Sequence, residues 1–210
     1  VRRSLGFYSA STALYPRLTA RETLEFFGRI NRYPKERIGA RVADLVERFG
    51  ITEYAGARVE KLSSGMKQKV SIARTVIHDP PVLIFDEPTV GLDVINALEM
   101  VRVIGKLRDE GKTVIFSTHI MSEAEKLCDR IAVIHKGRIL AIGTLEDLRR
   151  ETGEHYLEDI FVHYVVERAD EPEAAAIGAA GVLEVGDAAS APSSGSGSGR
   201  APDGGPEAGA

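Results

Sequence analysis

Two short apolar runs, one on each side of a helical pattern, constrain the fold of this chain more than any other feature. The runs are VLIF at 82–85 and TVIFS at 113–117, and both are rich in β-branched residues. Such runs are typical of central strands in a sheet that is covered on both faces. Between them, Asp93 begins a helix and Gly111 ends it, with apolar residues at helical spacing at Leu98, Val101, Ile104 and Leu107. Strand, long helix and strand in this order predict a parallel α/β unit with a right-handed crossover.

The residues before this unit are predicted to form one short strand and then helices. The strand is SLGFYS at 4–9. Thr19 and Glu22 form an S/T-x-x-E capping box, which indicates the start of a helix. A second helix begins at Pro34 and ends at Gly50, and its apolar residues share one face: Ile38, Val42, Leu45, Val46 and Phe49. The first third of the chain is therefore expected to be mainly helical.

The residues after this unit predict a hairpin and two helices. In RIAVIHKGRILAIG, two strands are expected to meet in a tight turn at Lys136-Gly137. Thr144 and Asp147 cap a short helix, and YLEDIFVHYVVER predicts a last amphipathic helix. From Ala169 onward the chain has 12 Ala, 9 Gly and no aromatic residue. This composition cannot bury enough apolar surface to offset the entropy of ordering, so a disordered tail is expected.

Composition excludes several classes of protein. The net charge of −4 includes −6 from residues 169–210, so the first 168 residues carry +2 and lack the basic surface of a nucleic-acid-binding protein. No apolar run approaches the roughly 18 residues of a membrane-spanning helix, and none follows Val1 as in a signal peptide. Cys128 is the only cysteine, so an internal disulfide is excluded, and we expect it to pack inertly.

The segment VLIFDEPTVGLD, at 82–93, carries the strongest chemical pattern. An apolar strand ends in two adjacent carboxylates, Asp86 and Glu87, and a proline follows. In open α/β sheets, ligands bind outside the carboxyl ends of the strands. Paired acids at this place suit one Mg²⁺ ion and one water to be activated. If the acids only ended a strand, two charges would be left there without partners, at a considerable cost in free energy.

Two further segments are weak signals alone and become more informative together with VLIFDEPTVGLD. In LSSGMKQK, at 62–69, two serines and a glycine head a helix, where free backbone N–H groups can bind an anion. Taken alone, the same residues also suit an ordinary N-cap. His119 directly follows the strand TVIFS and is predicted to stand at the same sheet edge as Asp86. A lone histidine in this position is more often structural than catalytic.

Together these segments resemble the ABC ATPase family. LSSGMKQK is similar to its signature motif, with Ser64 and Met66 as departures, LIFDEP to Walker B, Gly91–Asp93 to the D-loop, and His119 to the switch histidine. The motifs occur in the family's order as far as about Val166. The segments LGFYSASTALYPRLTARETL and STHIMSEAEKLCDRIAVIHKGRILAIGT are more specifically similar to sodium-exporter-type ATPases.

The resemblance implies the ABC ATPase core, which is a P-loop NTPase-like α/β fold with a mostly parallel sheet flanked by helices, plus an α-helical subdomain. It divides the chain into a remnant of the core and Q-loop region (1–18), the helical subdomain (19–80), the ATPase core (81–150), a C-terminal helix (151–168) and the tail (169–210).

The resemblance also implies a role for each site residue. Asp86 holds Mg²⁺, Glu87 is the general base, and His119 contacts the γ-phosphate of ATP. The signature residues Ser63, Ser64 and Gly65 bind ATP held by a second ATPase subunit, in a homodimer or heterodimer, and Asp93 links the two sites. A separate membrane permease is the transport partner, which places the subunit on the cytoplasmic face of the cell membrane. No nucleic-acid partner is expected.

Two departures from the family pattern bear on activity. Ala10 aligns with the family's Q-loop glutamine, which suggests an altered coupling loop. The 210 residues contain no G-x-x-x-x-G-K-[ST] Walker A motif, and the nearest match, Gly105–Thr113, has five residues between its glycines instead of four. We expect the motif to lie upstream of Val1, and the 210 residues alone to hydrolyse ATP negligibly.

The leading hypothesis is therefore the ATP-hydrolysing subunit of an exporter. A catalytically inactive remnant that binds a partner and a soluble ABC ATPase without a transport role are the alternatives. The transported substrate cannot be read from this chain, because the permease selects it.

Overall fold

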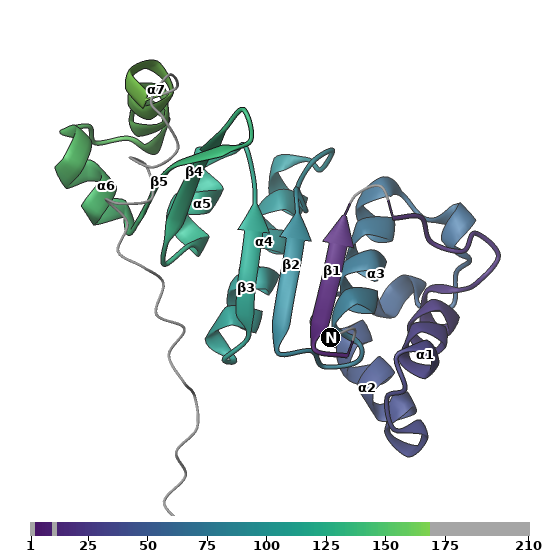
Figure 1. Cartoon of the computed structure of the whole chain (residues 1–210). Coiled ribbons are helices and arrows are strands. Elements are labelled where there is room, and N and C mark those ends of the chain that lie inside the picture. Colours follow the sequence, from purple (N-terminus) through teal and green to yellow (C-terminus); the bar gives the residue numbers. More distant parts are fainter. Residues whose placement is uncertain (1–2, 10–11, 169–210) are drawn as a thin grey trace, which may run out of the picture.

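The computed structural model describes residues 3–9 and 12–168, which form a three-stranded sheet, a separate hairpin and the helices that cover them (Figure 1). The sheet contains β1 (Leu5–Ser9), β2 (Val82–Asp86) and β3 (Thr113–Ser117) in the order β1-β2-β3, and both pairings are parallel. All three predicted strands are thus confirmed. Their carboxyl ends lie at one edge of the sheet.

The predicted helices form before and between these strands. In the capping box of α1 (Ala20–Ile30), the Glu22 backbone N–H donates to Thr19 Oγ1 and the Thr19 backbone N–H donates to Glu22. Helix α2 (Lys35–Arg48) buries the predicted apolar face and ends before Gly50, whose φ of 62° is left-handed. Two short 3₁₀ turns, η1 (Thr52–Tyr54) and η2 (Val59–Lys61), lead into α3 (Ser64–Val76).

Helix α4 (Val94–Asp109) makes the crossover between β2 and β3, and Asp93 caps it as predicted. Its buried side chains include Val101, Ile104 and Leu107. Leu98 lies in this helix as predicted, but its side chain is exposed, whereas Met100 is buried in the core. The buried face of α4 therefore includes Met100, and Leu98 lies on the side that faces solvent.

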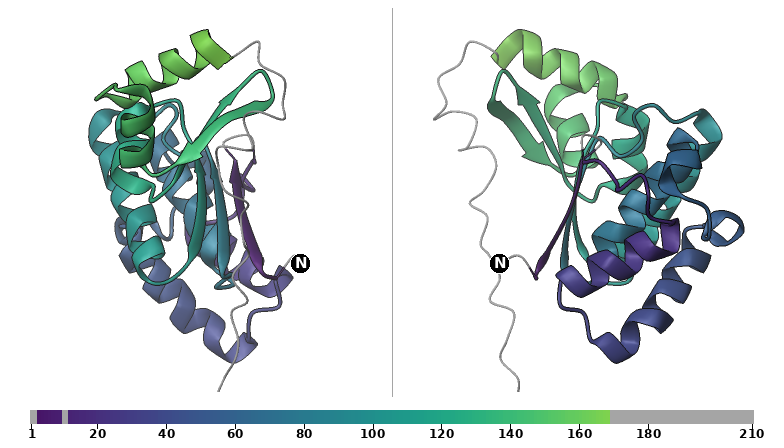
Figure 2. Two further views of the ribbon diagram at one scale, coloured as in Figure 1. Left: turned by 60° about the vertical axis from the view of Figure 1, so that its left-hand side comes forward. Right: turned by 90° about the vertical axis from the view of Figure 1, so that its right-hand side faces the viewer.

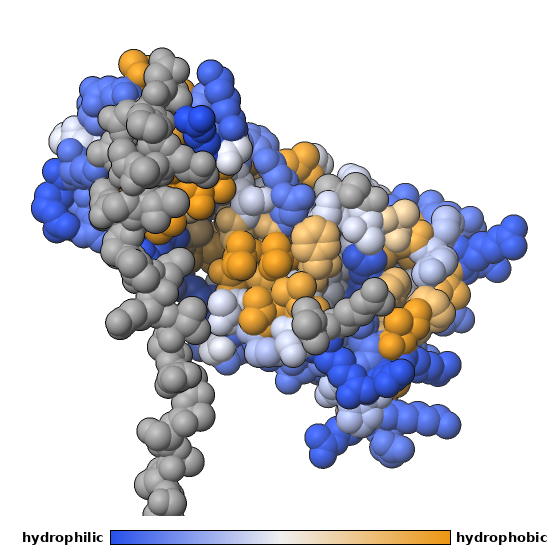
Figure 3. All heavy atoms as spheres, viewed as in Figure 1, coloured by the Kyte–Doolittle hydropathy of each residue, from blue (hydrophilic) through white to orange (hydrophobic). Residues whose placement is uncertain are grey.

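Within the part of the chain that the structure describes, helices cover one face of the sheet and leave the other open, as the two further views show (Figure 2). Along β1 and β2, alternate residues such as Tyr8, Leu83 and Phe85 are buried against the helices, and Val114 and Phe116 of β3 are partly buried on the same side. On the opposite face Phe7, Ile84 and Ile115 lie in register, with Phe7 52% and Ile115 54% exposed. The space-filling view shows this apolar area over the sheet (Figure 3). In the described residues, therefore, the second face of the sheet is open.

The hairpin and the last helices form a second apolar cluster. Strands β4 (Ile131–His135) and β5 (Arg138–Gly143) are antiparallel, and positive φ angles at Lys136 and Gly137 make the predicted tight turn. Helices α5 (Met121–Leu127), α6 (Leu145–Thr152) and α7 (Leu157–Arg168) pack around them. Cys128 packs against both clusters, and burial raises the pKa of its thiol, in line with an inert packing role.

Strands β3 and β4 do not pair, and a cavity of about 770 Å³ opens between them. Within the described residues, no helix combines the length and the apolar character needed to span a bilayer. Ala10 and the expected disordered tail, 169–210, lie outside the described residues.

Candidate active site

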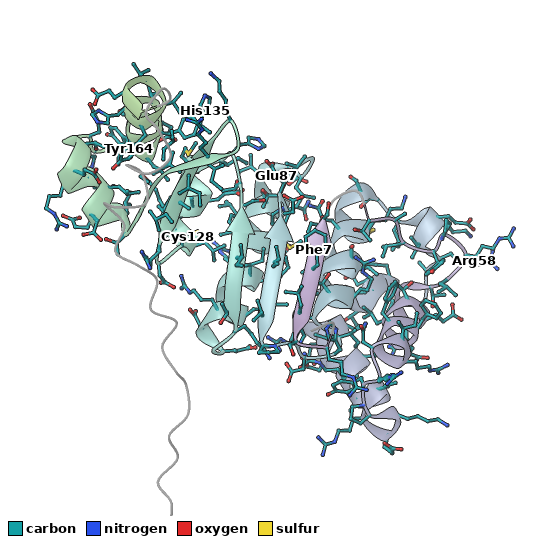
Figure 4. The ribbon with its side chains drawn as sticks, viewed as in Figure 1. Phe7, Arg58, Glu87, Cys128, His135 and Tyr164 are labelled. Carbon is teal, nitrogen blue, oxygen red and sulfur yellow. The ribbon has the colours of Figure 1, made fainter. Side chains whose placement is uncertain are left out.

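The carboxyl edge of the sheet brings together Asp86 at the end of β2, Glu87 directly after it, and the histidine that comes after β3. Glu87 lies at the end of β2 (Figure 4). Its Oε2 atom is 2.6 Å from Nδ1 of His119. The two side chains therefore point toward each other, as the sequence predicted from the parallel strands. A carboxylate only accepts hydrogen bonds, so a proton on Nδ1 makes His119 the donor in this contact.

The pair is open to solvent. The Glu87 side chain is 38% exposed and that of His119 is 66% exposed. Exposed ion pairs contribute little to stability, typically about 1 kcal/mol or less. The contact also leaves Nε2 of His119 as the ring nitrogen that Glu87 does not engage. The arrangement thus suits binding and proton transfer at an accessible edge better than it suits stabilisation of the fold.

Ser117 joins the ends of β2 and β3, and the sequence reasoning did not identify it. Its Oγ donates to Oδ1 of Asp86 at 2.8 Å. The backbone N–H of Glu87 donates both to Oγ of Ser117 at 3.1 Å and to its carbonyl oxygen at 3.2 Å. These bonds hold Glu87 at a φ of 49°, a left-handed conformation that non-glycine residues seldom adopt. The parallel pairing of Asp86 with Ser117 is the pattern that could have revealed this residue.

The donor set at this edge fits Mg²⁺ in part. Asp86 is exposed, and its Oδ1 accepts from Ser117. Among residues 3–9 and 12–168, no three His, Cys, Asp or Glu side chains form a group able to hold a metal ion. Mg²⁺ is commonly bound by one or two carboxylates together with substrate phosphates and waters, and one carboxylate at an open edge meets that requirement.

The signature residues lie at the start of α3, beside the loop that follows β2. Ser63 is the N-cap of α3, its Oγ accepts from the Met66 backbone N–H at 3.3 Å, and both Ser63 and Ser64 are exposed. A Cβ on Gly65 would lie 3.5 Å from Leu92, an ordinary van der Waals distance, so the start of α3 packs beside this loop with room for a small side chain.

A side chain farther along α3 also contacts the loop after β2. Gln68, which the sequence reasoning did not single out, donates to the Pro88 carbonyl oxygen. The signature helix is therefore tied directly to the residue that follows Glu87.

Asp93 stands apart from the Glu87–His119 contact and acts as the cap of α4. Its Oδ1 accepts from the backbone N–H groups of Ile95 and Asn96, both at 3.1 Å. The hydrogen bond from the Asn96 backbone is the main cause that lowers the pKa of the Asp93 carboxyl. Asp93 is exposed, so its carboxylate caps α4 and is also accessible from the surface.

Comparisons with known proteins show which family this chain resembles. The model of the ABC transporter family matches residues 1–90. The chain is 42% identical over 167 residues to the ABC transporter ATP-binding protein NatA of Bacillus subtilis, covering 79% of this chain and 68% of NatA. It is 39% identical over 152 residues to the linearmycin resistance ATP-binding protein LnrL of the same organism, covering 72% of this chain and 49% of LnrL.

A solved structure extends the agreement to the fold. The dimeric ATP-binding cassette MJ0796, in a post-hydrolysis state with ADP and Pi bound, superposes with a TM-score of 0.61 at 29% identity. The match covers 68% of this chain and 64% of that chain. The similarity to NatA also confirms the resemblance to sodium-exporter-type ATPases. With the parallel sheet, the edge that carries Glu87 and His119, and these relatives, the chain belongs to the family of ABC transporter ATP-binding proteins.

Proposed function

We propose that this chain is the ATP-hydrolysing subunit of an ABC exporter and that it powers a separate membrane permease. The observation that carries the proposal is the 2.6 Å contact between Glu87 and His119 beside Asp86. Phosphoryl transfer depends mainly on positioning and on stabilising charge. In this proposal the edge supplies a base (Glu87), a carboxylate for a cation (Asp86) and an imidazole (His119) close to one another.

Each residue at the edge has one role in the proposal. A Glu87 oxygen takes the proton of the attacking water while the water oxygen bonds to the γ-phosphorus. The bond from that phosphorus to the β–γ bridging oxygen then breaks, which leaves ADP and phosphate. His119, held by Glu87 through Nδ1, presents Nε2 to the γ-phosphate. Asp86 holds Mg²⁺, which offsets the negative charge on the phosphates.

A second ATPase subunit completes the proposed site. Ser63 and Ser64 are exposed at the start of α3, where hydroxyl and backbone N–H groups favour a phosphate. We assign them, with Gly65, to the ATP held by the partner subunit, and we assign Asp93 to the link between the two sites. The dimeric arrangement of the similar cassette MJ0796 supports this assignment.

The permease and the direction of transport rest on relatives. The name of LnrL includes linearmycin resistance, and export of a toxic compound is a direct way to resist it. A chain of this kind reaches the cytoplasmic face of the membrane by binding the permease. The Q-loop position, Ala10, lies outside the described residues, so the coupling contact itself is not assigned.

Hydrolysis is the property to test first, on the chain preceded by a segment that carries a Walker A motif. Glu87→Gln keeps the shape of the side chain and removes its ability to take a proton. We expect phosphate release to fall by about 10²–10⁴-fold, as for loss of a general base, while binding of a fluorescent ATP analogue persists. Glu154→Gln, at an exposed position between α6 and α7, is the matched control. Equal rates for both variants would remove Glu87 from the mechanism.

A further inference from the structure

A buried carboxylate lies behind the Glu87–His119 contact. Glu123, in the first turn of α5, is 8% exposed. Its Oε2 accepts two hydrogen bonds, one from Thr89 Oγ1 at 3.0 Å and one from Thr118 Oγ1 at 2.9 Å. None of the ion pairs formed among residues 3–9 and 12–168 includes Glu123. Two threonine hydroxyls thus replace the water that this carboxylate loses on burial.

The two threonines belong to the two loops that carry the catalytic candidates. Thr89 follows Glu87 by two residues, and Thr118 immediately precedes His119. Thr118 Oγ1 also accepts from the Ile120 backbone N–H at 3.0 Å, which closes a turn around His119. One carboxylate oxygen therefore connects the loop after β2 to the loop after β3.

We propose that Glu123 is a positioning residue that holds the loops of Glu87 and His119 at contact distance. This inference rests on the function proposed above. The residue type suits the task, because an ionised carboxylate only accepts and can take two donors at one oxygen. Because both bonds end on one oxygen of a buried side chain, separating the loops would break at least one of them, at a considerable cost in free energy.

Turnover distinguishes this role from ordinary packing. Alanine at 123 leaves the hydroxyls of Thr89 and Thr118 without their shared acceptor. Misplacement of catalytic groups by about 1 Å can cost on the order of 10²-fold. We expect Glu123→Ala to lower kcat for ATP by a factor of that order, with KM changed by less than about threefold because the Walker A segment and the signature residues keep their places.

A conservative variant and a neighbour on the same helix provide the controls. Glu123→Gln keeps an oxygen acceptor and should recover most of the lost turnover. Glu125→Ala also removes a carboxylate from α5, but Glu125 accepts from the Leu157 backbone N–H and faces α7 instead of the catalytic loops. We expect it to leave kcat unchanged. Equal losses for Glu123→Ala and Glu125→Ala, or no rescue by glutamine, would overturn the proposal.

A spectroscopic measurement on the 210-residue chain tests the inference without ATP. With ¹⁵N-labelled histidine, the ring nitrogens of His119 are assigned by comparison with His119→Ala. We expect its Nδ1 resonance to show the hydrogen bond to Glu87, and to lose this signature in Glu123→Ala but not in Glu125→Ala. If Glu123→Ala does not fold, the near-isosteric pair Thr89→Val and Thr118→Val removes the same hydrogen bonds from the other side.

The two measurements separate the inference from the proposed function. An unchanged His119 resonance in folded Glu123→Ala, or in the paired threonine variant, would overturn the positioning role. A changed resonance combined with no ATP hydrolysis by the unmodified chain joined to a Walker A segment would instead refute the proposed function, and the structural link through Glu123 would stand.

Discussion

Removing the hydroxyl of Ser117 is predicted to impair catalysis more than folding. The Ser117 side chain stands at the exposed carboxyl end of β3, and Ser117→Ala deletes one oxygen atom there. That oxygen donates to Asp86 Oδ1 at 2.8 Å and accepts from the Glu87 backbone N–H at 3.1 Å. The Glu87 N–H keeps its second acceptor, the Ser117 carbonyl oxygen at 3.2 Å. The bond to Asp86 is therefore the main loss.

The magnitude follows from the type of bond and its exposure. A hydrogen bond to a charged group contributes about 1.5–3 kcal/mol, and solvent at this open edge reduces the value toward about 1 kcal/mol for stability. If a comparable free energy is lost from the transition state, about 1.4 kcal/mol corresponds to a tenfold fall in rate. We therefore expect kcat to fall by about tenfold and the free energy of unfolding by about 1 kcal/mol.

The assay measures phosphate release by the chain joined to a Walker A segment, and urea unfolding of the 210-residue chain. Ser117→Thr is the control, because it keeps the hydroxyl and suits a strand. We expect its rate to stay near that of the unmodified chain. If Ser117→Ala retains full turnover, the serine does not set the position of Asp86 or Glu87. If the rate and the stability fall together in both variants, the effect is one of folding.

Three further predictions concern regions outside the site. Burial raises the pKa of the Cys128 thiol, so the thiolate fraction at neutral pH is small; a thiol reagent should modify it more slowly than free cysteine, and an equal rate would contradict its burial. The hydrogen bond from the Thr19 backbone N–H is the main cause that lowers the pKa of Glu22. The Glu22 carboxylate therefore stabilises the fold at pH values above the ordinary pKa of glutamate, and this stabilisation is lost as the pH falls through the lowered pKa. The difference in unfolding free energy between the unmodified chain and Glu22→Gln should therefore vanish in acid, and a constant difference would refute the capping box. Phe7 and Ile115 are half exposed on the open face, so the double variant Phe7→Ser/Ile115→Thr should bind less of an apolar dye with little change in melting temperature, and undiminished dye binding would place the apolar surface elsewhere.

Local patterns in the sequence predicted much of the fold. The capping box at Thr19 and Glu22, the cap at Asp93 and the turn at Lys136-Gly137 each depend on residues within a few positions of one another. The meeting of Glu87 and His119 was also predictable, because the ends of neighbouring parallel strands share one edge. The roles of the site residues in catalysis stay predictions.

Features that depend on register and on neighbouring layers were not predictable. Ile115 sits in an apolar run, and its local sequence does not show that it, rather than its neighbours Val114 and Phe116, lies on the open face. The bonds of Ser117 and Glu123 require the pairing of Asp86 with Ser117 and the placement of α5 under two loops. Both residues are polar in ordinary positions, so nothing in their local sequence marks them.

The central claim is that Glu87 and His119 act as one unit in hydrolysis, and a double-mutant cycle tests it most directly. Single-turnover phosphate release is measured for the chain joined to a Walker A segment, for Glu87→Gln, for His119→Ala and for the double variant. Because Glu87 Oε2 lies 2.6 Å from His119 Nδ1, the effects should be strongly non-additive. We predict that the double variant is about as slow as Glu87→Gln alone. Losses that multiply, with each residue contributing independently, would contradict the account.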